Sequence, residues 1–117
     1  MSELVQKLAD GRHRVIFRPI RENAVEELKE CIDRGYVHIK FTETKGGTEL
    51  GVRLDDDLTD LTGADFGAGS GSIHVAGNLT LDYVKVRCVA DLDISKMEGE
   101  GHLEILEDED SNDGDAN

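Results

Sequence analysis

The sequence predicts an α+β domain in which a curved, mostly antiparallel sheet of about six strands packs on one main helix as a partly closed barrel or roll. Residues 84–94, VKVRCVADLDI, alternate apolar and polar side chains, which is the period of a half-buried strand. Several shorter stretches alternate in the same way and are joined by turn-forming residues. Residues 24–34 form the clearest segment with a helical period. We therefore expect the long alternating run to be the spine of the sheet.

Two helices are expected. Ser2 and Gly11 bracket a short N-terminal helix that needs packing to persist. Asn23 is a suitable N-cap for the main helix, which spans residues 24–34 and stops at Gly35. Its apolar stripe consists of Val25, Leu28 and Ile32.

The first strands follow from alternation and from turn residues. Residues 12–19 read as a strand that ends at the only proline, Pro19. Residues 36–44 alternate as a second strand, and Gly46 and Gly47 supply the positive φ angles of a tight reversal. Residues 50–54 then return as an antiparallel neighbour.

The second half of the chain is less regular. Residues 55–71 are rich in Asp and Gly, and we expect a helical turn around Leu58 and Leu61 or a functional loop there. Gly77-Asn78 lies between two short alternating runs and predicts a hairpin turn. The inward parity changes between residues 81 and 84, which predicts a β-bulge near Asp82 and Tyr83. A reversal at residues 95–98 precedes a last strand at residues 101–106.

The apolar positions expected to face inward outnumber what one helix can cover. They are Val15, Phe17, Val37, Ile39, Phe41, Leu50, Val52, Leu54, Ile73, Val75, Leu79, Leu81, Val84, Val86, Cys88, Ala90, Leu92, Ile94, Leu103 and Ile105. A helix about 10 Å wide shields two or three strands spaced about 4.8 Å apart. Either the sheet rolls into a barrel, or a second copy of the chain covers the apolar sheet face in a homodimer.

Charge and composition restrict the partners. The chain has 117 residues and a net charge of −13, and residues 107–117 carry six acids and no base. We expect a single domain over residues 1–106 and a disordered acidic tail over residues 107–117. Such charge repels nucleic acid and anionic membrane surfaces, so neither is an expected partner. No long apolar segment and no signal peptide is present in the sequence, which predicts a cytoplasmic location.

Basic and imidazole side chains share the outward parity of the predicted strands. These candidate ligand-binding residues are His38, Lys40, Arg53, His74, Lys85, Arg87 and His102. On one sheet they would form a patch for a carboxylate or phosphate ligand, or for the acidic surface of a partner. The alternative is an ordinary solvated face with cross-strand ion pairs. The basic run of Arg12, Arg14, Arg18 and Arg21 would pair with the acidic loop or tail of the same chain, or receive an acidic partner.

Metal binding and catalysis have weaker support. Asp55, Asp57 and Asp60 crowd one loop, but their spacing does not fit a calcium loop of the EF-hand type, which favours solvated carboxylates. Cys31 and Cys88 lie on apolar faces and are expected to be buried free thiols. No cofactor and no catalytic residue is predicted.

Two functions remain as alternatives. The first is a non-catalytic interaction module, an accessory or regulatory part of a cytoplasmic complex, which docks on a protein partner or on itself through the sheet face or the acidic surface. The second is a small-ligand-binding domain like a β-barrel, in an enzymatic form or not, which acts on an anionic carboxylate or phosphate molecule. The direction of the seven outward side chains discriminates between them, because a ligand pocket requires that they converge.

Overall fold

The computed structural model describes residues 3–18 and 24–108 of the chain. The elements in chain order are α1 (Glu3–Ala9), β1 (His13–Arg18), α2 (Ala24–Arg34), β2 (Tyr36–Phe41), β3 (Thr48–Leu54), β4 (Ala64–Asp65), β5 (Ser70–Leu81), β6 (Val84–Asp93) and β7 (Glu98–Asp108). The main helix has the predicted bounds. The last strand includes residues 107 and 108, the first two positions of the predicted tail. The rest of the predicted tail lies outside the described residues, as do Ser2, Pro19, Arg21 and Asn23, for which the sequence made predictions.

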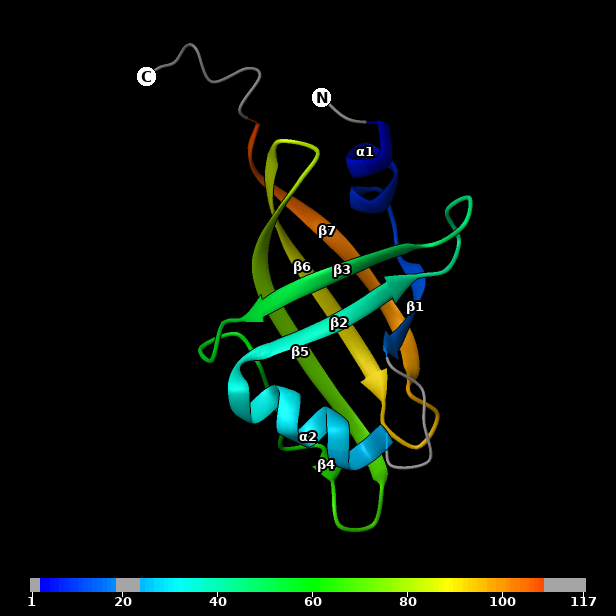
Figure 1. Cartoon of the computed structure of the whole chain (residues 1–117), viewed down its shortest axis with the longest axis vertical. Helices are drawn as coiled ribbons and strands as arrows, with labels where there is room; N and C mark the ends of the chain where they lie inside the picture. The colour runs from blue at the N-terminus through cyan, green and yellow to red at the C-terminus, as the bar shows by residue number, and fades with distance from the viewer. Residues whose placement is uncertain (1–2, 19–23, 109–117) are drawn as a thin grey trace.

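The sheet closes on itself. Its strand order is β3-β2-β1-β7-β6-β5-β4, and an additional pairing joins β3 to β5. All of these pairings are antiparallel, so β1, β2, β3, β5, β6 and β7 form a six-stranded barrel, which Figure 1 shows from one side. The predicted α+β class and the antiparallel, barrel-like sheet are confirmed.

The barrel interior is filled with apolar side chains. Phe17, Phe41, Ile39, Leu92 and Leu103 are among its largest fully buried members. The inward positions predicted from alternation are buried or packed against this core, except that the side chain of Ile105 is 39 % exposed. The apolar face that suggested a second copy of the chain is therefore enclosed within one chain.

Both helices contribute to the same core. Val5 and Leu8 of α1 and Leu28 of α2 are completely buried. Figure 1 shows α1 near the upper end of the barrel and α2 near the lower end. Within residues 3–18 and 24–108, no helix combines the length and the apolar character that a membrane span requires.

The bulge predicted near Asp82 and Tyr83 is wrong. These two residues have φ angles of 51° and 67° and form the hairpin turn between β5 and β6. Leu81 and Val84 pair directly across this turn and share one face. A two-residue turn places positions i and i+3 opposite each other, which changes the inward parity from odd to even without a bulge. The register shift of this region lies between Lys85 and Val86 in the pairing with β7.

The hairpin predicted at Gly77-Asn78 is also wrong. Both residues lie inside β5, which runs without interruption from Ser70 to Leu81. Gly77 is required by the approach of β3, because a Cβ atom at this position would lie 2.0 Å from the carbonyl oxygen of Arg53. The glycine therefore marks a close backbone contact.

The loop before β5 contains no helix at Leu58 or Leu61. A hydrogen-bonded turn joins the amide of Leu58 to the carbonyl of Asp55, with 3.1 Å between nitrogen and oxygen. Asp60 then forms an isolated bridge with His74, and β4 pairs with the start of β5. The loop is thus attached to the outside of the barrel by short stretches of pairing.

The reversal after β6 occurs close to its predicted position. The carboxylate of Asp93 accepts hydrogen bonds from the amide and the hydroxyl of Ser95, at 2.9 and 2.6 Å. Met97 adopts a φ angle of 56° and its carbonyl accepts the amide of Phe17 at 2.9 Å. The last strand begins at Glu98, three positions earlier than its predicted start at residue 101.

Replacing Gly77 with alanine should destabilise the barrel, because the new Cβ would collide with the carbonyl of Arg53. Overpacking of this kind typically costs about 1–3 kcal/mol, with a Tm change of about 4 °C per kcal/mol. Thermal unfolding followed by circular dichroism measures the effect. Gly67→Ala is the matched control, since its Cβ would lie 3.4 Å from Asp65 Oδ1, an ordinary van der Waals contact. Equal Tm values for the two variants would contradict the role given to Gly77.

Candidate functional site

Closure of the barrel brings part of the predicted patch together on the outer face. One row of cross-strand partners runs from Tyr36 on β2 through Arg53 on β3, Asn78 on β5 and Arg87 on β6 to Glu104 on β7. Adjacent strands lie about 4.8 Å apart, so Arg53 and Arg87 are separated by about two strand spacings. We call the surface formed by Arg34, Arg53, Asn78, Lys85 and Arg87 the arginine face.

Three open hollows meet on the arginine face. One of about 350 Å³ lies between Arg34, Tyr36 and Arg53. A second of about 360 Å³ shares Arg53 and reaches Asn78. The third, of about 350 Å³, shares Asn78 and is bounded by Lys85 and Leu106, among others. Arg53 and Asn78 therefore lie at the centre of a continuous uneven surface.

The guanidinium groups of this face have unused donors. The side chain of Arg53 is exposed and forms no ion pair or hydrogen bond with any other residue of the described ranges 3–18 and 24–108. Arg87 has one Nη1 contact with Glu104 Oε1 at 3.4 Å, whereas its buried Nε has no hydrogen-bond partner. The Nη2 of Arg34 faces the sulfur of Cys31 at 3.7 Å, which is a weak acceptor. Apart from the buried Nε of Arg87, the arrangement therefore offers several N–H groups to an acceptor that comes from outside.

Apolar side chains border one end of the arginine face. Leu106 is the extra residue of β7 opposite the register shift, and its side chain is 44 % exposed. Tyr83 in the nearby hairpin turn is 76 % exposed. Asp55 and Asp56 line the hollow that joins Arg53 to Asn78. The face thus combines cations, an apolar edge and two carboxylates.

The other four predicted site residues lie elsewhere on the outer surface. His38 meets the ring of Tyr36 edge-on at 5.2 Å, and the Lys40 side chain lies against Gly47. His102 Nε2 is 3.5 Å from Glu104 Oε2. His74 pairs with Asp91, four positions along β5 from Asn78, or roughly 13 Å. The seven residues therefore do not converge on one pocket.

His74 belongs to a separate ion-pair cluster. Its Nδ1 is 2.7 Å from Asp91 Oδ1, and Arg12 Nη2 is 2.8 Å from Asp91 Oδ2. Partial burial raises the pKa of Asp91, but the hydrogen bonds from His74 and Arg12 outweigh it, so the net effect is a pKa below the usual value of 3.8. Arg12 also contacts Glu100, and Arg14 contacts Glu98. Among the described residues, these two arginines thus pair with strand carboxylates and not with the acidic loop that was predicted as a partner.

The loop aspartates form turns. Asp55 Oδ1 accepts the amide of Asp57 at 3.0 Å. Asp60 Oδ1 accepts the hydroxyl and the amide of Thr62, at 2.7 and 2.9 Å, and these bonds lower the pKa of Asp60. Within the described part of the chain, no three His, Cys, Asp or Glu side chains are grouped so that they could hold a metal ion.

Arg34, Asn78 and Leu106 were not predicted as site residues. Arg34 was assigned only to the end of the helix at 24–34. Asn78 was predicted to lie in a hairpin turn, but it lies within β5. Leu106 follows the inward position of Ile105 and so has the outward parity, but as an apolar residue it was not among the basic and imidazole candidates. A local signal for Asn78 was its place on the outward parity of β5, which a continuous strand would have revealed.

Asp91→Asn should reduce stability at neutral pH but not in acid. A carboxylate whose pKa is lowered by folding stabilises the protein above its unfolded pKa, and this contribution is lost as the pH falls through the folded pKa. Because the side chain is 49 % exposed, we expect a loss of about 1 kcal/mol or less at pH 7. Urea unfolding at several pH values measures it, with Asp33→Asn on α2 as control. A difference from the parent protein that grows toward low pH would refute this assignment.

The two thiols should differ in reactivity. Burial raises the pKa of Cys88 to about 12, whereas Cys31 is partly exposed. Treatment of the native protein with iodoacetamide at pH 8 should modify Cys31 alone, and Cys88 should react only after unfolding. Peptide mass spectrometry locates the label. Modification of Cys88 at the rate of Cys31 would show that the core opens far more readily than its packing implies.

No protein-family model matches the chain, and no curated protein is significantly similar to it. The arrangement of side chains on the outer face therefore has to support any functional assignment by itself.

Proposed function

We propose that the chain is a non-catalytic interaction module that binds an acidic segment of a protein partner on its arginine face. The observation that carries this proposal is Arg53, an exposed guanidinium with no ion-pair partner among the described residues, at the junction of two hollows. On the same barrel, Arg12 and Arg14 are each paired with a carboxylate. A carboxylate of a partner could accept two parallel N–H hydrogen bonds from such a guanidinium group.

The content of the barrel interior favours an outer binding surface. Its core residues are apolar, and no polar or charged residue of the described ranges is buried. A pocket for a small carboxylate or phosphate needs polar groups that converge inside a cavity. Here the corresponding side chains lie on the convex outside. This geometry supports a macromolecular partner over the small-ligand alternative.

Charge and shape suggest which partner segments fit. At physiological ionic strength the Debye length is about 8 Å, so the net charge of the chain is largely screened beyond the binding surface. Arg53 and Arg87 lie within that distance of a segment placed over Asn78, and they attract carboxylates. Leu106 and Tyr83 offer apolar contact at one end. We therefore expect a segment with one or two acidic residues next to a large apolar residue.

Selection from a random displayed peptide library on the immobilised protein tests this proposal. The enriched peptides should combine acidic and apolar residues, and a synthetic peptide of the enriched sequence should bind in solution. Arg53→Ala should weaken its affinity about tenfold, which corresponds to the loss of a charge-assisted hydrogen bond pair.

Arg12→Ala is the matched control, because Arg12 lies on the barrel surface outside the arginine face and is paired with Asp91. Its affinity for the peptide should match that of the parent protein. Thermal unfolding of both variants verifies that they fold. An enriched set without acidic residues, or equal weakening by the two substitutions, would overturn the proposal.

A further inference from the structure

The barrel is closed by a very short contact. β3 and β5 pair only at Arg53 with Asn78 and at Leu54 with Gly77. In Figure 1 the two strands meet near the arrowhead of β3 and diverge toward its other end. We call the stretch where residues 48–52 of β3 and residues 79–81 of β5 do not pair the notch.

The backbone on both sides of the notch is oriented toward it. The amide of Leu54 bonds the carbonyl of Gly35, so alternate residues of β3, including Val52, bond β2. Gly51 therefore directs its N–H and C=O away from β2 and toward β5. The amide of Asp55 donates a hydrogen bond to the carbonyl of Ala76, so Ala76 directs its backbone groups toward β3. Thr80, four positions later on β5, has the same orientation because alternate residues of a strand face the same neighbour.

Continuing the register of the closure would pair Gly51 with Thr80, but this pair does not form. The sides of the notch also differ in burial: Val52 is completely buried, whereas Leu79 and Leu81 are partly exposed. Leu79 and Thr80 also line the hollow of about 350 Å³ beside Lys85, whose other lining residues lie on β5, β6 and β7. The notch therefore combines strand edges that have no strand partner among the described residues with an apolar wall.

We infer that the partner segment binds in the notch as an added β-strand, paired with the free edge of β3 at Gly51. This inference rests on the proposed function and specifies how the same segment is held. Main-chain hydrogen bonds to a sheet edge supply affinity, and alternate side chains of the added strand supply specificity. Apolar residues of the segment would face Leu79 and Leu81.

The charge at the closed end of the notch selects the occupant. Arg53 is the β3 residue at which the closure begins, two positions from Gly51 along the strand. A segment that runs along the edge of β3 therefore presents its end to Arg53 and Asn78, where a carboxylate is favoured.

Amide hydrogen exchange of the full chain tests the free edges before any peptide is added. The amides of Gly51 and Thr80 should exchange at least tenfold faster than those of Val52 and Leu79, their neighbours bonded to β2 and β6. Saturation with the peptide selected on the arginine face should slow exchange at Gly51 at least tenfold. Protection of Thr80 alone, or of neither amide, would overturn the inference.

N-methylation of the peptide at each position in turn gives the second test. Alternate positions should lose affinity at least fivefold, since one main-chain hydrogen bond of about 1 kcal/mol is removed, and the positions between them should tolerate the change. A peptide that depends on Arg53 but shows no such period would disprove strand addition and leave the proposed function intact. If the selection yields no peptide whose affinity depends on Arg53, the proposed function itself is disproved.

Self-association is distinguished by mass in solution. Sedimentation of the chain alone should give a monomer at concentrations where Gly51 exchanges rapidly. A dimer whose formation protects Gly51 would assign the edge of β3 to a second copy of the chain and overturn the acidic-segment occupant.

Discussion

The structure depends on the contact that joins β3 to β5. Two residue pairs and the bond between the amide of Asp55 and the carbonyl of Ala76 turn an open sheet into a barrel. Gly77 permits this approach because it carries no side chain where β3 passes. The core residues of the two strands face the same interior only because the contact exists. Burial of apolar side chains, the dominant favourable contribution to folding, therefore relies on a short stretch of backbone pairing.

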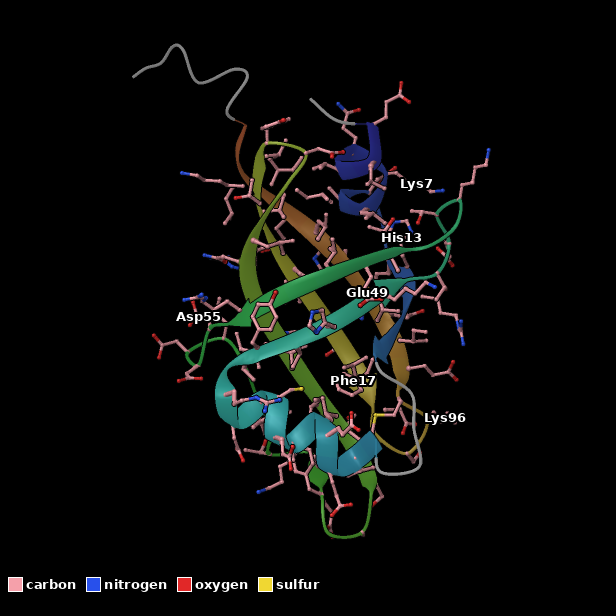
Figure 2. All side chains as sticks on the ribbon, in the orientation of Figure 1. Lys7, His13, Phe17, Glu49, Asp55 and Lys96 are labelled. Carbon is pink, nitrogen blue, oxygen red and sulfur yellow. The ribbon has the colours of Figure 1, made fainter. Side chains whose placement is uncertain are left out.

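Unequal strand lengths explain why the contact is short. β5, β6 and β7 contain 12, 10 and 11 residues, whereas β2 and β3 contain 6 and 7. The long strands extend past the short ones, so β5 leaves β3 after two pairs and continues to its hairpin with β6 (Figure 1). Figure 2 shows the same region with side chains, with Asp55 at the loop that follows the closed end of β3. The unequal strand lengths thus account both for the closure of the barrel at Arg53 and for the notch beside it.

Local patterns predicted the elements and most of the core. Alternation identified the inward residues of every barrel strand, because burial on one side imposes a period of two. The helix at 24–34 was predicted from its stripe, and its structure has the same bounds. The errors at Gly77 and at Asp82 with Tyr83 share one cause: glycine was read as a turn residue, although a distant strand required it. The candidate site was predicted in part. The cations Arg53, Lys85 and Arg87 were named as site residues. The sequence did not predict that they lie apart from His38, His74 and His102.

The sequence by itself determined which side chains face the core, where the helices begin and end, and that an acidic chain carries cations on the outside of its strands. These properties follow from neighbours within a few residues. Only the tertiary structure decided that the sheet closes, that Arg53 lies two strands from Arg87, and that Gly51 and Thr80 do not pair with each other. Such contacts join residues far apart in the chain, and their register depends on the twist and relative length of whole strands, which no local pattern encodes.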